Sequence, residues 1–265
     1  MQIKIIKLIP VALVFLFSAC SLLPDKTDET KTWSAAKLYS EAREELANGG
    51  YEKAIQHFEK LESRYPFGTY AQQAQMEIAY AHYRQGDQAQ ALAAVERFIK
   101  LHPNHPNVDY MYYLRGLINF NDKLGVFDFL SKQDPTERDP KATREAFDAF
   151  KQLTERFPDS VYTKDAISRM KYLVNAMAQY EVHVAGYYYR RGAFLAAANR
   201  AQIAVKEYHD TPAVEEALFL MVRSYDELAL NDLRDDAERV LKKNYPNSIF
   251  FRGGRVKTDP WWKIW

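Results

Sequence analysis

The side chains best suited to metal or acid–base chemistry are six histidines, which are scattered along the chain. His102 and His105 flank Pro103 and could share a metal ion, but two ligands without further partners do not complete a tetrahedral site. The sequence contains no GxSxG, no HExxH and no phosphate-binding glycine loop. We therefore expect no enzymatic activity, no metal and no soluble cofactor.

The one cysteine, Cys20, suits a different reaction, because Ser18 and Ala19 stand directly before it. This arrangement resembles a bacterial lipobox, in which the cysteine receives a diacylglycerol group on sulfur and an acyl chain on nitrogen. Phe17 departs from the usual leucine of that motif, and a plain secretory signal with an incidental cysteine is the alternative. Ser21, where another sorting signal would have Asp, indicates the outer membrane. Two or three acyl chains would form a stable anchor.

Aromatic side chains and an arginine gather in the segment RYPFGTY, residues 64–70. They surround a proline and a glycine at the end of a helical hairpin, where a concave face would begin. One reading is a binding surface formed by Tyr65, Phe67, Gly68 and Tyr70. A tightly packed turn between two repeats is the alternative.

A second cluster, YYYRRGAFLAAANR, covers residues 187–200 and places three tyrosines and two arginines just before a turn. Arg200 follows on the next helix. Arginine together with tyrosine is typical of the residues that dominate protein–protein interfaces. Tyr187, Arg191 and Arg200 are therefore candidate partner-binding residues, with solvated arginines beside half-buried tyrosines as the alternative.

The N-terminus has the features of an export signal. Lys4 and Lys7 precede an apolar run at residues 8–17, which is too short to span a bilayer comfortably and is interrupted by Pro10. We expect residues 1–19 to be removed and residues 20–32, which are mostly polar, to form a lipidated flexible tether.

The charge of the remaining chain argues against nucleic acid as a partner. Removal of residues 1–19 deletes two lysines and changes the formal net charge from +1 to about −1. Proteins that bind a duplex normally show a basic domain or stripe. Once Cys20 is acylated, no thiol remains for a disulfide, so packing must stabilise the fold.

The elements that position these clusters are repeated helical hairpins. An alanine stands 12 residues before a proline or histidine four times, at Ala54 and Pro66, Ala91 and Pro103, Ala146 and Pro158, and Ala197 and His209. In three units a glycine precedes the alanine by five residues, at Gly49, Gly86 and Gly192. The glycine permits a left-handed turn, the alanine lets two helices approach, and the proline ends the second helix.

The endpoints of these units lie 37, 55 and 51 residues apart, against about 34 in a standard tetratricopeptide unit. We assign the enlargement to an insertion at residues 121–140 and to a long first helix at residues 162–190. A fifth hairpin, residues 213–246, has a degenerate turn at residues 230–233 and does not keep the 12-residue spacing.

These patterns predict an all-α, tetratricopeptide-like (TPR-like) helical solenoid of about five helical hairpins over residues 33–246. It comprises N-terminal repeats at residues 33–120, enlarged repeats at residues 121–210 and the last hairpin. First helices of such a stack line a concave surface that binds peptides or proteins.

The C-terminal tail, residues 247–265, carries three tryptophans and two phenylalanines beside basic residues. This composition suits a membrane interface or a protein partner. A segment folded back as a cap over the last repeat is the alternative, and we slightly favour it.

Four blocks of sequence resemble the BamD (ComL) family of outer-membrane assembly lipoproteins. They are residues 64–75, RYPFGTYAQQAQ, residues 105–120, HPNVDYMYYLRGLINF, the RDP at residues 138–140, and residues 180–200. The enlarged third repeat and Cys20 fit as well. The resemblance extends over roughly residues 39–246.

The resemblance implies a non-catalytic subunit of the β-barrel assembly (Bam) machinery at the outer membrane, facing the periplasm. Its C-terminal repeats would dock on a POTRA domain of BamA, with Arg200 pairing with an acidic residue of BamA and Arg191 and Tyr187 assisting. The region of Tyr65, Phe67, Gly68 and Tyr70 would recognise the aromatic C-terminal signal of unfolded β-barrel proteins. Other Bam lipoproteins would dock too.

Two functions of other classes are kept as alternatives. A periplasmic helical repeat could tether the cell wall as a peptidoglycan-associated lipoprotein, or it could serve as an adaptor of a cell-wall enzyme. The sequence offers nothing that selects a glycan as ligand.

Overall fold

The computed structural model describes residues 28–120 and 140–252. The predicted signal peptide, Cys20, residues 20–27 of the tether, residues 121–139 of the insertion and residues 253–265 of the tail lie outside the described residues. Within the described ranges, helices and the turns between them account for the structure and no strand is present.

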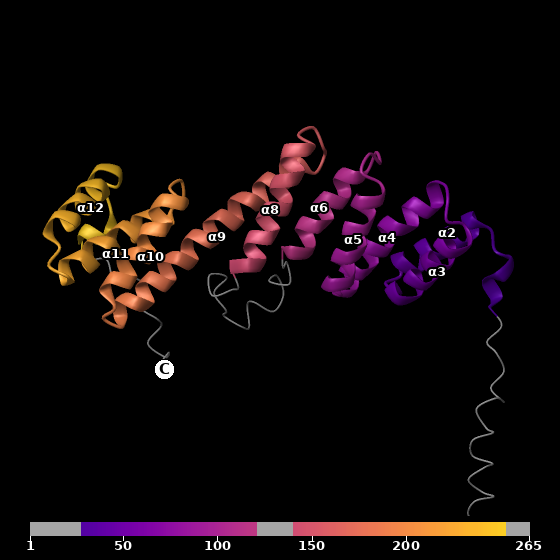
Figure 1. Ribbon diagram of the computed structural model, residues 1–265, viewed down its shortest axis with the longest axis horizontal. Coiled ribbons are helices and arrows are strands. Elements are labelled where there is room, and N and C mark those ends of the chain that lie inside the picture. Colours follow the sequence, from indigo (N-terminus) through magenta and orange to yellow (C-terminus); the bar gives the residue numbers. More distant parts are fainter. Residues whose placement is uncertain (1–27, 121–139, 253–265) are drawn as a thin grey trace, which may run out of the picture.

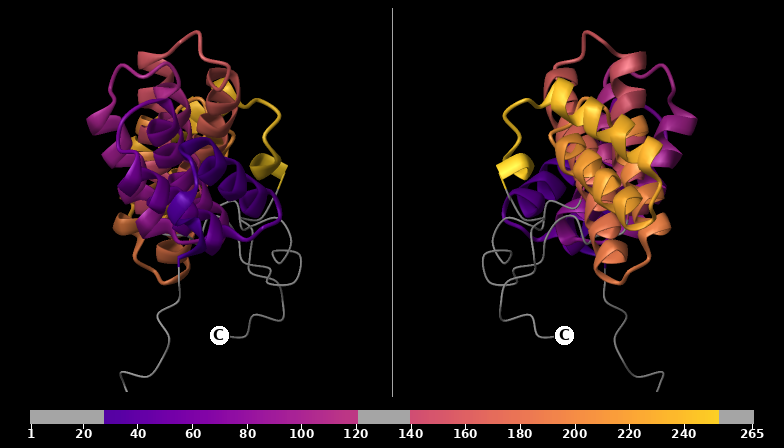
Figure 2. Two further views of the ribbon diagram at one scale, coloured as in Figure 1. Left: turned by 90° about the vertical axis from the view of Figure 1, so that its right-hand side faces the viewer. Right: turned by 90° about the vertical axis from the view of Figure 1, so that its left-hand side faces the viewer.

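In residues 28–120 and 140–252, ten α-helices form five antiparallel hairpins, which stack into an elongated array (Figure 1). In chain order the pairs are α2 (Ala35–Ala47) with α3 (Tyr51–Arg64), α4 (Thr69–Gln85) with α5 (Gln88–Leu101), α6 (Val108–Asn119) with α8 (Pro140–Arg156), α9 (Thr163–Arg190) with α10 (Phe194–Glu207), and α11 (Ala213–Glu227) with α12 (Asn231–Asn244). Viewed along the long axis, the hairpins are superposed, as expected of units that stack in one direction (Figure 2). The predicted all-α solenoid of about five hairpins is confirmed.

The recurring alanines pack where the two helices of a hairpin and the next unit meet. Each is fully buried in the second helix of its hairpin, and so is the residue four positions later, one turn along the same face. The buried pairs are Ala54 and Phe58, Ala91 and Val95, Ala146 and Phe150, and Ala197 and Ala201.

The turn of the fifth hairpin differs from the prediction. We expected it at residues 230–233, but α11 ends at Glu227 and α12 begins at Asn231. Ala229 has a φ of 56°, the left-handed conformation that Gly86, with a φ of 84°, adopts in the second hairpin. Arg234 stands five residues later, 12 before Pro246. The spacing is therefore kept, with alanine in the place of glycine and arginine in the place of alanine.

The core consists of four clusters along the stack, each shared by neighbouring hairpins. They lie between α2, α3 and α4, between α4, α5 and α6, between α6, α8 and α9, and among α9 to α12. Helix α9 has 28 residues, about 42 Å at 1.5 Å per residue. Ala166 and Leu173 in its first half belong to the third cluster, and Ala178 and Val182 in its second half belong to the fourth.

Both ends of the described chain pack on the solenoid. Residues 28–32, which the sequence analysis assigned to the tether, include the 3-10 helix η2 (Glu29–Thr32), and Arg64 of α3 donates hydrogen bonds to Asp28 and Thr30. At the other end, Phe250 in η4 (Ile249–Arg252) stacks on Phe219 of α11, with ring centroids 4.6 Å apart. The first residues of the predicted tail therefore lie against the last hairpin.

Candidate protein-binding surfaces

The first candidate surface is the connection between α3 and α4, residues 65–70, which we call the aromatic turn. Tyr65 follows α3 and its hydroxyl donates a hydrogen bond to the carbonyl oxygen of Trp33 at 3.0 Å. Phe67 is 91% exposed, so the turn is not tightly packed at this residue. Gly68 has a φ of 101°, and no atom lies within 4 Å of the position that a Cβ would occupy.

The aromatic turn continues onto the faces of α2 and α4. The ring of Tyr70 lies 5.5 Å from that of Tyr39, which in turn packs on buried Phe58 at 5.7 Å. Burial raises the pKa of the Tyr39 phenol, and the nearby Glu77 carboxylate raises it further. Tyr70 lies in the first turn of α4 and contacts Tyr39 of α2, so the aromatic turn continues onto both helices.

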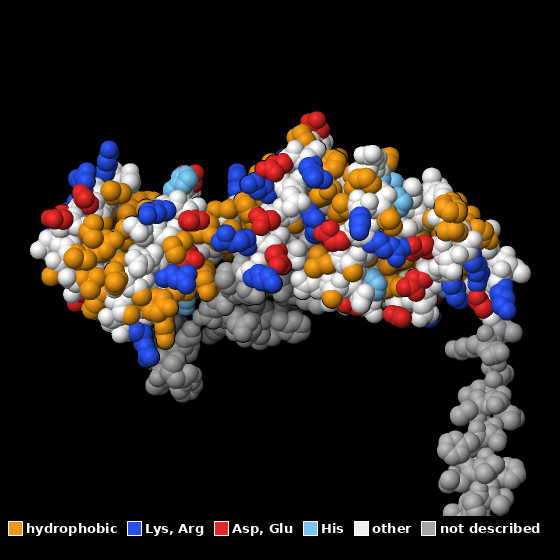
Figure 3. Space-filling view, in the orientation of Figure 1, with side chains coloured by type: hydrophobic (Ala, Val, Ile, Leu, Met, Phe, Trp, Pro, Cys, Tyr) orange, Lys and Arg blue, Asp and Glu red, His pale blue; other side chains and the backbone are white. Residues whose placement is uncertain are grey.

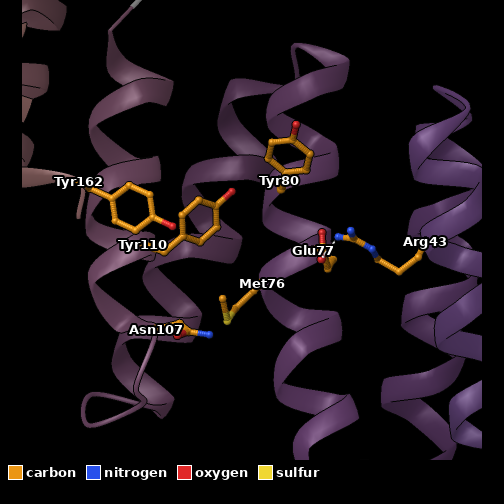
Figure 4. Close-up of a pocket in the computed structure, with 7 residues that line it drawn as sticks. All are labelled: Arg43, Met76, Glu77, Tyr80, Asn107, Tyr110 and Tyr162. Carbon is orange, nitrogen blue, oxygen red and sulfur yellow. Dashed lines mark hydrogen bonds and ion pairs between the residues drawn. The ribbon is translucent and has the colours of Figure 1, made fainter. Parts of the chain in front are cut away.

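Beyond Tyr39 lies a pocket of about 500 Å³, which we call the groove pocket (Figure 4). Its residues come from three hairpins and the start of a fourth: Arg43 on α2, Met76, Glu77 and Tyr80 on α4, Asn107 and Tyr110 at the start of α6, and Tyr162 directly before α9.

Glu77 and Arg43 form an ion pair on one side of the groove pocket. The Glu77 side chain is 17% exposed and that of Arg43 is 52% exposed. Burial raises the pKa of the Glu77 carboxyl, although Arg43 and the Tyr39 hydroxyl act in the opposite direction. One half-exposed guanidinium thus does not fully offset the loss of hydration around this carboxylate.

Two phenol rings, those of Tyr110 and Tyr162, line the other side. Tyr110 and Tyr162 contact each other with centroids 5.6 Å apart, and Tyr113 stacks on Tyr162 at 4.8 Å. Burial raises the pKa of both Tyr110 and Tyr162, so their hydroxyls stay protonated at neutral pH. Neither hydroxyl makes a hydrogen bond to any residue in the described ranges, which leaves two polar groups open to a ligand.

The groove pocket is absent from the predictions made from the sequence, because its residues come from separate helices and form no local motif. A signal was nevertheless present. Arg43 and Glu77 are 34 residues apart, the length of a standard tetratricopeptide unit, so opposite charges occupy equivalent positions in successive first helices.

The second candidate surface lies at the C-terminal end of α9. Tyr187 is 48% exposed, and its ring packs edge-on against Tyr188 at 5.8 Å. Arg191 follows the last residue of α9, with its guanidinium 5.9 Å from the centre of the Tyr187 ring. The structure therefore brings Tyr187 and Arg191 together.

Arg200, on α10, is already paired within the protein. Its Nη1 donates a hydrogen bond to Oε2 of Glu181 at 3.0 Å, and this interaction raises the pKa of Arg200. The Arg200 side chain is 39% exposed, whereas that of Glu181 is 13% exposed. A partner that binds this guanidinium must therefore share it with Glu181 or displace that carboxylate.

The two histidines that could share a metal ion make other contacts. Nε2 of His102 lies 2.9 Å from Oε1 of Gln75, and the rings of His102 and His105 both pack on Phe98. Burial lowers the pKa of His105. In the part of the chain that the structure describes, no three His, Cys, Asp or Glu side chains are grouped to hold a metal.

Basic and acidic side chains are interspersed on the face shown in Figure 3, and apolar side chains gather over the end formed by α11 and α12. None of the helices within residues 28–120 and 140–252 combines the length and apolarity needed to cross a membrane.

Comparison with known proteins gives a family match over most of the chain. Residues 31–241 match the model of the YfiO family, described as an outer membrane lipoprotein. A Neisseria meningitidis serogroup A protein named outer membrane protein assembly factor BamD is 45% identical over 97% of this chain and 98% of its own length. A protein of the same name from Vibrio cholerae is 38% identical over 88% of this chain and 95% of its own length. Another, from Haemophilus influenzae, is 32% identical over 91% of each chain.

Among solved structures, a variant of a Podosopora anserina kinesin light chain with TPR-like repeats matches with a TM-score of 0.34 and 13% identity. The match covers 80% of this chain and 95% of the other. The sequence comparisons confirm the resemblance found from the sequence blocks: the chain belongs to the YfiO family of outer membrane lipoproteins and is a relative of the proteins named BamD.

Proposed function

We propose that this protein is a non-catalytic scaffold lipoprotein of outer-membrane β-barrel assembly. The observation that carries the proposal is the near full-length likeness to a protein named outer membrane protein assembly factor, which covers 97% of this chain and 98% of the relative. A likeness of that extent includes both candidate surfaces. The Bam complex is therefore the assembly in which we expect the chain to act.

Cys20 would hold the protein at the outer membrane through its acyl chains, with the solenoid on the periplasmic side. The lipid is the only prosthetic group in this proposal, and no step requires catalysis. The segment at residues 28–32 supports this arrangement, because its contacts with α3 fix the point at which an anchor would join the fold.

The end of α9 would dock on a POTRA domain of BamA. A guanidinium offers paired donors to a carboxylate, so Arg200 suits an acidic side chain of that partner, with Arg191 and Tyr187 adding contacts around it. Since Glu181 already holds Arg200 at 3.0 Å, docking would exchange or share this ion pair.

The aromatic turn would receive unfolded β-barrel proteins. The final strand of such a substrate ends in alternating apolar residues and an aromatic, and exposed Phe67 with half-exposed Tyr65 and Tyr70 can contact those side chains. Other Bam lipoproteins would bind elsewhere on the solenoid.

Affinity purification of the tagged lipoprotein from gently solubilised outer membranes tests the docking surface. We expect a POTRA-containing barrel protein to co-elute with the wild type and to be depleted with Arg200→Glu, which places a carboxylate beside Glu181. Arg239→Glu is the matched control, because Arg239 on α12 is 73% exposed and pairs with Asp236 of the same helix. Absence of such a barrel from every sample would contradict the proposal.

A further inference from the structure

The groove pocket is not accounted for by either surface of the proposed function. It lies between α2, α4, α6 and the start of α9, next to the aromatic turn through Tyr39 and Tyr70. The pocket has a volume of about 500 Å³, which is enough for one large side chain, and it is open to solvent. It can therefore hold a single side chain of a ligand whose backbone lies outside the pocket.

The two sides of the pocket differ in charge. The carboxylate of Glu77 lies on the side of α4 that faces Arg43, and the rings of Tyr110 and Tyr162 lie across the pocket from it (Figure 4). Tyr80 adds a third ring. A ligand group in the middle would meet a partly buried carboxylate on one side and aromatic faces and hydroxyls on the other.

We propose that the groove pocket holds a basic side chain, arginine or lysine, of a polypeptide bound along the first helices of the hairpins. Aromatic rings attract a cation through their negative faces, and a carboxylate strengthens the site. The inference rests on the proposed function, which it deepens by assigning a second subsite and a charge requirement to the bound substrate.

Other occupants fit the chemistry less well. An anion would be repelled by Glu77, and the guanidinium of Arg43 is already engaged with that carboxylate. An aromatic ring would remove water from Glu77 without supplying charge, at a desolvation cost to the carboxylate. A cation instead adds the positive charge that Arg43, with a 52% exposed side chain, supplies only in part.

The path from the aromatic turn sets the register of the basic residue. Tyr70 contacts Tyr39, and Glu77 stands seven residues after Tyr70 on α4, so an extended segment that meets Tyr70 reaches the pocket within a few residues. Alternate side chains of a strand share one face. The basic residue is therefore expected two, four or six positions before the terminal aromatic residue that binds at the turn.

The test uses the full-length protein in detergent and fluorescent peptides of about twelve residues, about 40 Å when extended. Each peptide ends in alternating apolar residues and a terminal phenylalanine and carries arginine at one of the three positions. Its matched peptide carries citrulline, which keeps the shape but lacks the charge. Fluorescence anisotropy gives both dissociation constants.

In one register we expect the arginine peptide to bind about tenfold more tightly than its citrulline counterpart. Glu77→Gln and Tyr110→Leu should reduce that ratio to near one, whereas Tyr110→Phe, which keeps the ring, should preserve it. Glu62→Gln is the control, because Glu62 pairs with Arg97 outside the pocket. Thermal unfolding followed by circular dichroism checks that each variant is folded.

Failure of the inference and failure of the proposed function give different results. If both peptides bind and Phe67→Ala weakens both, but the arginine and citrulline peptides are equal in every register, the basic subsite is wrong and the aromatic turn stands. The subsite is also wrong if Glu77→Gln weakens both peptides equally. If no peptide binds to the wild type, both the subsite and the substrate role of the turn are wrong.

Discussion

The first three hairpins and the last two build their interiors differently. Among the described residues, the three largest fully buried side chains, Phe58, Phe98 and Phe150, belong to α3, α5 and α8. The cluster among α9 to α12 is more than half alanine, with Ala201 at 0% exposure. Large side chains in the first region must fill volume, whereas small ones in the second let helix backbones approach closely.

Their surfaces differ in a parallel way. The groove pocket has phenol hydroxyls without a partner within the described ranges, so a ligand adds interactions there. On α10, Arg200 already holds Glu181, so a ligand must share this guanidinium or displace the internal carboxylate. A ligand can therefore bind in the groove pocket without breaking an internal interaction. At Arg200, a carboxylate of the ligand competes with the internal carboxylate of Glu181.

The largest effect tests the interior of the first region. Phe150→Ala should lower the free energy of unfolding by about 3–5 kcal/mol, because it removes a fully buried ring and leaves a cavity. Urea denaturation followed by circular dichroism measures the change. Phe67→Ala makes the same chemical change at a 91% exposed position, and we expect an effect below about 0.5 kcal/mol. Equal losses would contradict the packing described for α8.

The reverse substitution tests the second region. Ala201→Leu should cost about 1–3 kcal/mol of unfolding free energy, because α10 has no space for three further carbons beside α9 and α11. Ala47→Leu on the exposed end of α2 is the control and should change stability little. A neutral Ala201→Leu would show that the alanine-rich interior is loosely packed.

Competition at Arg200 predicts a gain of affinity from removing its internal partner. Glu181→Gln should strengthen binding of the purified POTRA-containing partner by up to about fivefold, since a partly exposed ion pair contributes up to about 1 kcal/mol. Surface plasmon resonance measures the dissociation constant. Weaker binding by Glu181→Gln would mean that the pair orients Arg200 and that no exchange occurs.

At the N-terminal end, pH should control the contacts of residues 28–32. Hydrogen bonds from Thr30 and Lys60 hold the pKa of Asp28 well below its usual range. The stabilisation is therefore complete above the unfolded value of 3.8 and decreases as pH falls below it. The difference in urea midpoint between wild type and Asp28→Asn should be larger at pH 7 than at pH 2. A difference independent of pH would exclude this origin.

The smallest expected effect concerns Glu77, whose carboxyl has a pKa raised by burial. The folded protein holds this proton more tightly than the unfolded chain, so ionisation lowers stability as pH rises through the folded-state pKa. Glu77→Gln should therefore have a urea midpoint at or slightly above that of the wild type at pH 7. A clear loss of stability would identify Glu77 as a structural residue and weaken its assignment to a binding pocket.

Local signals in the sequence were sufficient to predict the turns and the second helices of the hairpins. Gly49, Gly86 and Gly192 mark the left-handed turns, and the alanine-to-proline spacing locates the second helices, because both depend on backbone conformation and close packing. The same spacing was missed in the fifth hairpin, since Ala229 stands at the position of the glycine and Arg234 at the position of the alanine. Backbone strain at Ala229 is tolerated there, and composition alone does not reveal it.

The candidate sites were only partly predictable. The exposure of Phe67 and the proximity of Arg191 to Tyr187 involve residues that are close in sequence. Two other features depend on contacts across helices: the pairing of Arg200 with Glu181, 19 residues earlier, and the position of Tyr162 opposite Glu77. Such contacts follow from how the hairpins stack, which a single sequence does not specify.

The length of α9 has a consequence for how the protein unfolds. In a regular repeat array, stability is a sum of nearest-neighbour terms, and one end can melt while the other persists. Here one uninterrupted helix contributes Leu173 to one hydrophobic cluster and Val182 to the next, so neither cluster can be lost without exposing part of the same helix. The five hairpins should therefore melt in a single cooperative transition, which would keep the two candidate binding surfaces at a fixed separation.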